Sequence, residues 1–306
     1  MKPIHPLHGL VAATHTPLQP DGSLNLAVVE QQAAHLLRNG VTIAFINGTT
    51  GECQSLSLEE RLTLAQRWLQ VARGTALKVS VHVGSNCLSD ARALAAQAER
   101  LGAISISAFA PSYFKPRSLD MLVAWCAELA GAAPNTPFYF YDIPVFTQVA
   151  LPMPEFLEQA PARVPTLAGL KFTNPDLMAY QLCLHAGGGR FDVAYGSDEW
   201  LLAALALGAR GAVGSTYNFA APIYHRLLTA FAAGDLDAAR QEQFRSVQLI
   251  KLLAGHGFMG AAKATMTLLG VDVGPARLPN ASLAPEAIRQ LRGELETLGF
   301  FDWIRP

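Results

Sequence analysis

Short apolar runs alternate along the chain with longer segments whose apolar residues recur every three or four positions. The runs are rich in Val, Ile, Phe and Ala and end in loops of Gly, Pro, Ser and Thr, a pattern typical of β-strands. The segments between them, such as 58–73 and 89–102, predict amphipathic helices. The predicted strands are 9–16, 41–48, 78–84, 103–109, 137–143, 167–173, 191–197 and 211–217.

Strands that alternate with helices pair in parallel, and eight such units predict an α/β fold, the (β/α)8 TIM barrel. A doubly wound open sheet is the alternative. The loop at 14–23 lacks the glycine fingerprint that would follow the first strand of such a sheet. The pattern therefore favours the barrel.

Further helical patterns follow the last predicted strand, at 219–232, at 236–270 with a break at 255–257, and at 284–298. They exceed what a barrel needs and predict a C-terminal three-helix extension. We expect a barrel core at 1–220, and the last barrel helix with the extension at 221–306. No linker separates the two parts, so they are expected to form one folding unit.

The composition and charge indicate which kinds of partner to expect. The chain has 306 residues, 51% hydrophobic and 15% charged, with a formal net charge of −1. It has no basic block, so we expect no nucleic-acid partner. The start, "MKPIHPLHGL", lacks the apolar core of a signal peptide. No apolar run approaches the roughly 18 residues of a membrane span, so we expect no membrane partner.

Potential metal ligands are scattered. The cysteines show no C-x-x-C spacing, and none of the eight histidines shows ligand spacing. The sequence predicts neither a metal site nor a disulfide framework, and its cysteines suit a reducing cytoplasm. The cysteines are Cys53, Cys87, Cys126 and Cys183.

One lysine stands inside a predicted strand. Lys171 lies near the C-terminal end of "LAGLKFT", and chemistry in a barrel gathers at the C-terminal ends of strands. Gly169 and Thr173 share its face, and the glycine is expected to leave room for a ligand to approach the amine. Burial favours the neutral amine, a nucleophile that forms Schiff bases with carbonyl substrates. The alternative is a lysine that reaches the rim or pairs with a carboxylate.

Loops at the same end of the barrel could complete a site. Tyr141 ends the neighbouring fifth strand, where a phenol beside a cationic imine can move protons. The loop "NGTTGE" (47–52) combines backbone N–H groups with threonine hydroxyls, which suits a carboxylate. In "YGSDEW" (195–200), Asp198 and Glu199 suit the hydroxyls of a sugar, although both could simply begin the next helix.

Together, "GTTGE", the Tyr-x-Ile-Pro at 141–144 and "GLKFT" at 169–173 resemble the N-acetylneuraminate lyase and dihydrodipicolinate synthase superfamily. These are class I aldolases that form an imine with pyruvate. The similarity extends from "GLVAATHTPL" through the C-terminal helices, essentially the whole chain. It implies a TIM barrel with a C-terminal helical region, and a homotetramer built as a dimer of dimers.

The resemblance also implies a role for each matching residue. Lys171 would form the imine, Tyr141 would relay protons, and Thr50 would hydrogen-bond Tyr141. Tyr113, in "PSYFKP", would enter the site of a neighbouring subunit. The implied substrate-binding residues are Gly48, Thr49 and Thr50 for the carboxylate, Thr173 beside the lysine, and Gly196, Asp198, Glu199 and Ser215 for a polyhydroxy tail.

One departure separates the branches of the superfamily. The synthases place an arginine five residues after the catalytic tyrosine, and this chain has Phe146 there. A phenyl ring cannot replace a guanidinium in bidentate carboxylate recognition. The lyase branch uses a Gly-x-Asp-Glu after the seventh strand and a Gly-Ser-Thr-Tyr after the eighth, and both are present. The chain therefore resembles the lyases more closely.

The resulting hypothesis is a Schiff-base lyase that reversibly cleaves a 2-keto-3-deoxy sugar acid, N-acetylneuraminate or a shorter one, to pyruvate and an aldehyde. Its partners would be a small keto acid and an aldehyde, and it would need no cofactor beyond the covalent imine at Lys171. The alternatives are a 4-hydroxy-tetrahydrodipicolinate synthase that uses aspartate semialdehyde, a keto-deoxy sugar acid dehydratase, and a non-catalytic ligand-binding barrel.

Overall fold

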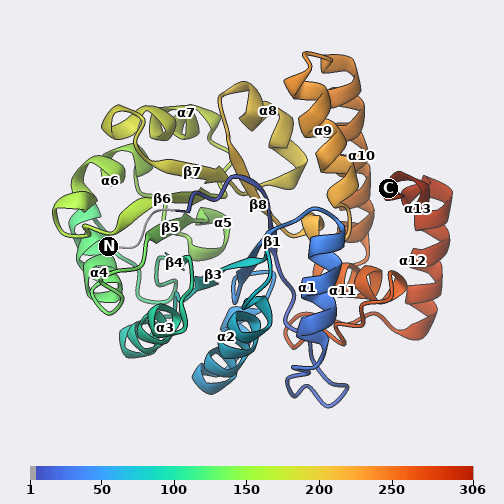
Figure 1. Cartoon of the computed structure of the whole chain (residues 1–306), viewed down its shortest axis with the longest axis horizontal. Helices are drawn as coiled ribbons and strands as arrows, with labels where there is room; N and C mark the ends of the chain where they lie inside the picture. Colours follow the sequence, from blue (N-terminus) through green and yellow to red (C-terminus); the bar gives the residue numbers. More distant parts are fainter. Residues whose placement is uncertain (1–4, 306) are drawn as a thin grey trace.

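Eight parallel strands close into a barrel in the computed structural model, which describes residues 5–305 (Figure 1). Each strand pairs with its sequence neighbours, and β1 pairs with β8. The predicted barrel is confirmed, and every strand lies within its predicted range. The strands are β1 (Gly9–Ala13), β2 (Ile43–Ile46), β3 (Lys78–His82), β4 (Ser105–Phe109), β5 (Phe138–Asp142), β6 (Leu167–Phe172), β7 (Asp192–Tyr195) and β8 (Gly211–Gly214).

Helices cover the outside of the barrel (Figure 1). In α2, a capping box fixes the first turn: Ser57 Oγ accepts from the Glu60 N–H, and the Glu60 carboxylate accepts from the Ser57 N–H. Leu64 and Trp68 then fall on its buried face. The helices are α1 (Val28–Arg38), α2 (Leu58–Ala72), α3 (Leu88–Leu101), α4 (Leu119–Ala130), α5 (Pro144–Thr147), α6 (Met153–Gln159), α7 (Leu177–His185), α8 (Leu201–Ala206) and α9 (Ala221–Ala232).

Side chains fill the barrel interior. Val11, Phe45, Tyr141 and Val213 belong to one buried cluster inside it. Tyr139 Oη, also inside, donates to Asp192 Oδ2 at 2.8 Å, at the end where β7 begins. The interior is therefore a packed core rather than a pore, which leaves the C-terminal ends of the strands for chemistry.

The C-terminal extension packs on one side of the barrel, where α10 runs beside α9 (Figure 1). It comprises α10 (Leu236–Gly255), α11 (Phe258–Leu268), α12 (Pro285–Leu298) and the short α13 (Phe300–Trp303). Leu249, Leu291 and Phe300 belong to the same buried core as the barrel helices. Within residues 5–305 no helix is long and apolar enough to cross a membrane.

Candidate active site

A cavity of about 560 Å³ opens at the C-terminal ends of the strands. Its inner walls come from residues that end or follow β2, β5, β6, β7 and β8, and the extension supplies the outer wall. The structure thus brings together residues that are far apart in sequence. The predicted site residues that line the cavity are Thr49, Thr50, Tyr141, Lys171, Thr173, Gly196, Asp198, Glu199 and Ser215.

Lys171 is buried at this mouth with only 3% of its surface exposed. It lies beside Tyr141 in the register of β5 and β6, and its Nζ is 4.0 Å from the centroid of the Tyr141 ring. The Phe45 ring lies 4.5 Å from the same atom. Among residues 5–305, no carboxylate oxygen lies within 4.0 Å of Nζ, so Lys171 is not half of an ion pair. An amine held between aromatic rings at a cavity is arranged for attack on a carbonyl.

Gly169 serves a different purpose from the one predicted. A Cβ at this position would lie 1.7 Å from the carbonyl oxygen of Asp192 on β7. The glycine therefore lets two barrel strands approach each other. The expectation that it leaves room for a ligand was wrong.

The two threonines after β2 make different contacts from the one predicted. Thr49 Oγ1 lies 3.4 Å from the Tyr141 hydroxyl, whereas Thr50 Oγ1 lies 2.6 Å from Ser215 Oγ. The predicted hydrogen bond from Thr50 to Tyr141 is therefore wrong. Thr50 instead links the β2 loop to the β8 loop in the cavity lining, and Thr49 is the partner of the phenol.

Asp198 is buried, although it lines the cavity. It begins a single helical turn, but its carboxylate turns to the next loop, where Oδ2 accepts from Thr216 N–H at 2.9 Å and Thr216 Oγ1 at 2.6 Å. Burial raises the pKa of Asp198 to about 6, against the opposing effect of these hydrogen bonds. Glu199 beside it is half-buried. The pair therefore places one tightly held and one freer carboxylate at the cavity.

Known proteins with similar sequences belong to a family of lyases and synthases. Residues 6–298 match the model of the "Dihydrodipicolinate synthetase family". The chain belongs to this family. It is 40% identical over 302 residues to N-acetylneuraminate lyase of Gallus gallus, covering 97% of this chain and 98% of that one. The predicted superfamily is confirmed.

Two solved structures are also close. N-acetylneuraminate lyase of Proteus mirabilis is 38% identical with a TM-score of 0.94, over 97% of this chain and 100% of that one. N-acetylneuraminate lyase (sialic acid aldolase) of Aliivibrio salmonicida is 40% identical with a TM-score of 0.94, over 98% of each chain. These relatives carry the names of the predicted branch.

In this member of the family, the loops after the neighbouring strands β6 and β7 contact each other at Thr173 and Gly196. A Cβ on residue 196 would lie 1.8 Å from Thr173 Oγ1, so only glycine lets the two loops meet. Two predicted residues lie outside the cavity lining. Gly48 packs against the Phe45 ring behind it. Tyr113 is 78% exposed, and its ring meets that of Phe114 edge-on at 5.0 Å.

Sequence reasoning missed the outer wall of the cavity. Ile250 and the segments 257–260 and 279–281, all from the extension, line it. The rule that barrel chemistry gathers at the C-terminal ends of strands points only to the loops that follow strands. The local sequence pattern therefore did not indicate these segments. Phe146 was singled out as a departure from the synthases, and it also lines the cavity with 66% of its surface exposed.

Proposed function

We propose that the chain is a class I lyase that reversibly cleaves a 2-keto-3-deoxy sugar acid, N-acetylneuraminate or a close analogue, to pyruvate and an aldehyde. The observation that carries this proposal is the buried amine of Lys171, which has no ion-pair partner among residues 5–305 and lies against the Tyr141 ring. The relatives named as N-acetylneuraminate lyases support the substrate class.

In the forward reaction, Lys171 Nζ attacks the keto carbon and water leaves, which gives a protonated imine. The imine draws electrons from the C3–C4 bond. As that bond breaks, Tyr141 Oη accepts the proton of the C4 hydroxyl, and an enamine and the aldehyde form. The positive imine beside the ring stabilises the phenolate that this step needs. Protonation of the enamine at C3 and attack by water then release pyruvate and restore the amine, so we expect no other cofactor.

Each end of the substrate has a matching wall. Thr49 and Thr50 would hold the carboxylate of the keto acid near Lys171, and Thr49 would orient the Tyr141 hydroxyl. Asp198 and Glu199 would accept hydrogen bonds from hydroxyls of the tail. These separate roles fit the positions of the two pairs on different loops at the cavity, after β2 and after β7.

The deciding experiment is borohydride reduction in the presence of pyruvate, followed by peptide mass mapping. We expect a reduced pyruvyl adduct on Lys171 in the wild-type chain and none in Lys171→Met. Lys251→Met, which changes an exposed lysine on α10, is the matched control and should keep the adduct. A folded wild-type chain without the adduct, or with the adduct elsewhere, would refute the mechanism.

Analysis of the products distinguishes the lyase from a dehydratase and from a synthase. Release of pyruvate from N-acetylneuraminate supports the lyase, whereas a product that keeps the carbon skeleton indicates a dehydratase. Condensation of pyruvate with aspartate semialdehyde should be slow, because Phe146 offers the second carboxylate no bidentate partner. Condensation as fast as sugar-acid cleavage would overturn this use of Phe146.

We also propose that the chain acts as a cytoplasmic homotetramer, a dimer of dimers. The exposed pair of Tyr113 and Phe114 supports an interface at this position, because large apolar side chains at a surface mark contact sites. The four cysteines are free in the structure, which suits a reducing compartment. Light scattering at several concentrations would test the tetramer.

A further inference from the structure

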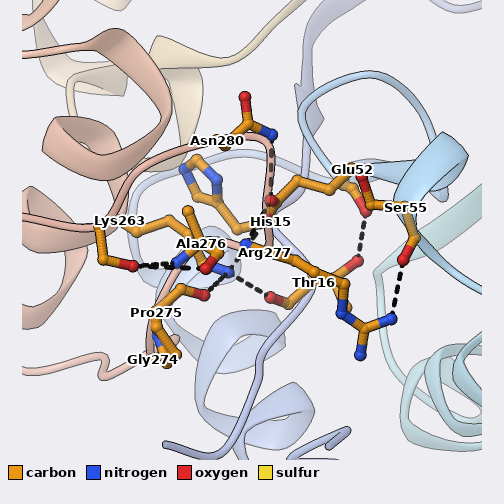
Figure 2. A network of polar contacts seen from close by, with 12 residues as sticks. His15, Thr16, Glu52, Ser55, Lys263, Gly274, Pro275, Ala276, Arg277 and Asn280 are labelled. Carbon is orange, nitrogen blue, oxygen red and sulfur yellow. Dashed lines mark hydrogen bonds and ion pairs between the residues drawn. The ribbon is translucent and has the colours of Figure 1, made fainter. Parts of the chain in front are cut away.

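A second buried lysine lies in α11, the helix whose first residues line the cavity. Lys263 in α11 is only 1% exposed. Its Nζ donates to Glu52 Oε1 at 3.1 Å, to Thr16 O at 2.9 Å and to Pro275 O at 2.6 Å (Figure 2). These acceptors match the three N–H groups of an ammonium ion. Lys171 has no such acceptors among the described residues 5–305, so the two buried lysines have opposite environments.

Glu52 is the centre of this polar network. It ends the loop that carries Thr49 and Thr50, and its φ of 54° is left-handed, an uncommon conformation for this residue type. Its second oxygen, Oε2, accepts from the Arg277 N–H at 2.8 Å and from Asn280 Nδ2 at 3.1 Å (Figure 2). Both carboxylate oxygens therefore bind the extension rather than the barrel.

Arg277 ties the same segment to the barrel a second time. Its guanidinium donates to both oxygens of Glu60, at 2.7 and 2.8 Å, and to Ser55 O at 2.8 Å. It also donates to Gly22 O. Through this bidentate pair the Glu60 carboxylate raises the pKa of Arg277, and the guanidinium lowers the pKa of Glu60, which indicates a favourable interaction of the charges.

The segment held in this way reaches the cavity. Pro279, Asn280 and Ala281 line it, so the side chain of Asn280 joins Glu52 directly to the outer wall. A buried ion pair is weak evidence for stability, because desolvation of the charges offsets their attraction. Fixing the relative position of two segments is a better-attested use of such a pair.

We propose that Glu52, Lys263 and Arg277 are positioning residues that hold the 279–281 wall against the Thr49–Thr50 loop and so set the affinity for the tail of the sugar acid. The assignment rests on the proposed lyase function. Imine formation with pyruvate occurs at the opposite wall, on β6, and does not need the extension to be in place. Loosening the wall should therefore weaken binding of the long substrate more than attack by Lys171.

The test uses Arg277→Met and the double variant Glu52→Gln/Lys263→Met, which removes both charges of the buried pair and leaves none unpaired. Arg67→Met is the matched control: Arg67 also forms an ion pair, with Glu30, at a similar side-chain exposure (28% against 23% for Arg277) but away from the cavity. In Arg277→Met we expect KM for N-acetylneuraminate to rise about tenfold, because small displacements of positioning groups cost this much. The rate of pyruvate trapping at Lys171 should stay within about twofold.

Arg277→Lys should keep part of the affinity that Arg277→Met loses, since a lysine can still donate to Glu60. Hydrogen exchange should rise in 274–281 in Arg277→Met and in the double variant but not in Arg67→Met. An unchanged KM in the folded variants, or an equal loss of trapping and cleavage, would overturn the assignment. A wild-type chain that neither traps pyruvate nor cleaves the sugar acid would instead refute the proposed function, before any substitution is made.

Discussion

Lys171 and Tyr141 are partners across β5 and β6, and the amine lies 4.0 Å from the centroid of the phenol ring. The strand pairing itself creates this contact, because residues opposite each other on parallel strands project to the same side of the barrel wall. The nucleophile and the proton carrier are thus fixed by regular backbone, which positions groups more accurately than loops do. Thr49 lies on a loop, and its Oγ1 is 3.4 Å from the Tyr141 hydroxyl, which it can only orient.

Removing the Tyr141 hydroxyl should separate imine formation from bond cleavage. In Tyr141→Phe the ring still packs on Lys171, but no group accepts the C4 proton. We expect kcat for sugar-acid cleavage to fall by about 10²- to 10⁴-fold, while pyruvate trapping at Lys171 persists. Steady-state kinetics and mass mapping on the same preparation measure both effects.

Tyr139→Phe is the control on the same strand. Tyr139 Oη donates to Asp192 away from the cavity, so its loss should lower the free energy of unfolding by about 1–2 kcal/mol and leave kcat nearly unchanged. Equal losses of kcat in the two variants would show that the Tyr141 hydroxyl has no special role.

Adding one carbon at Gly196 should damage the site. The new Cβ of Gly196→Ala would meet Thr173 Oγ1 at 1.8 Å, so the β6 and β7 loops must separate. We expect kcat/KM to fall by about 10- to 100-fold and the free energy of unfolding to fall by about 1–3 kcal/mol. Enzyme assays and urea unfolding check both numbers.

Gly293→Ala provides the matched control. Gly293 lies within α12, and a Cβ there meets nothing within 4 Å. Alanine should raise the free energy of unfolding by up to about 1 kcal/mol without changing activity. If Gly196→Ala behaved in the same way, the close contact with Thr173 would not constrain the site.

Local pattern was sufficient to predict the strands and the residues at their ends. Each strand is an apolar run bounded by loop-forming residues, and Lys171, Tyr141 and Asp198 follow from their places at strand ends. The partners of those residues depend on side-chain packing, which local pattern does not encode. Thr49 rather than Thr50 is the partner of Tyr141, and Gly169 accommodates β7 instead of a ligand.

The part that the extension plays in the cavity was the larger omission. Lys263 and Glu52 are 211 positions apart, and the helical pattern around Lys263 gives no sign that its amine is buried. A charged side chain becomes buried only when tertiary structure supplies its acceptors, here Glu52 and two backbone carbonyls. Such pairing cannot be read from a single sequence, and neither can the wall at 279–281 that depends on it.

Asp198 should make activity and stability respond to pH in opposite directions. Its pKa of about 6 is raised above the usual 3.8, so the folded chain holds this proton more tightly than the unfolded chain. The resulting contribution to the free energy of unfolding, about 3 kcal/mol for such a shift, is complete below about pH 4. It is lost as pH rises through 6. The carboxylate that then forms is the better acceptor for sugar hydroxyls, so kcat/KM should rise over the same range.

Asp198→Asn should remove both responses, since the amide oxygen can still accept from Thr216 but carries no titrating proton. Asp142 is the control: burial also raises its pKa to about 6, but it does not line the cavity. In Asp142→Asn the rise of kcat/KM between pH 5 and 7 should persist. A pH profile of kcat/KM that is unchanged in Asp198→Asn would exclude this carboxylate from substrate binding.

Tyr113 offers a test of shared active sites. If Tyr113 of one subunit completes the site of its neighbour, Tyr113→Ala and Lys171→Ala are each defective for a different reason. In a mixed dimer, the subunit with Tyr113→Ala keeps its own Lys171 and receives an intact tyrosine from its partner. Refolding the two variants together in equal amounts should therefore restore about a quarter of wild-type activity, because half of the random dimers are mixed and each has one complete site. Activity that stays at the level of the separate variants, in samples shown by light scattering to be oligomeric, would place Tyr113 outside the site.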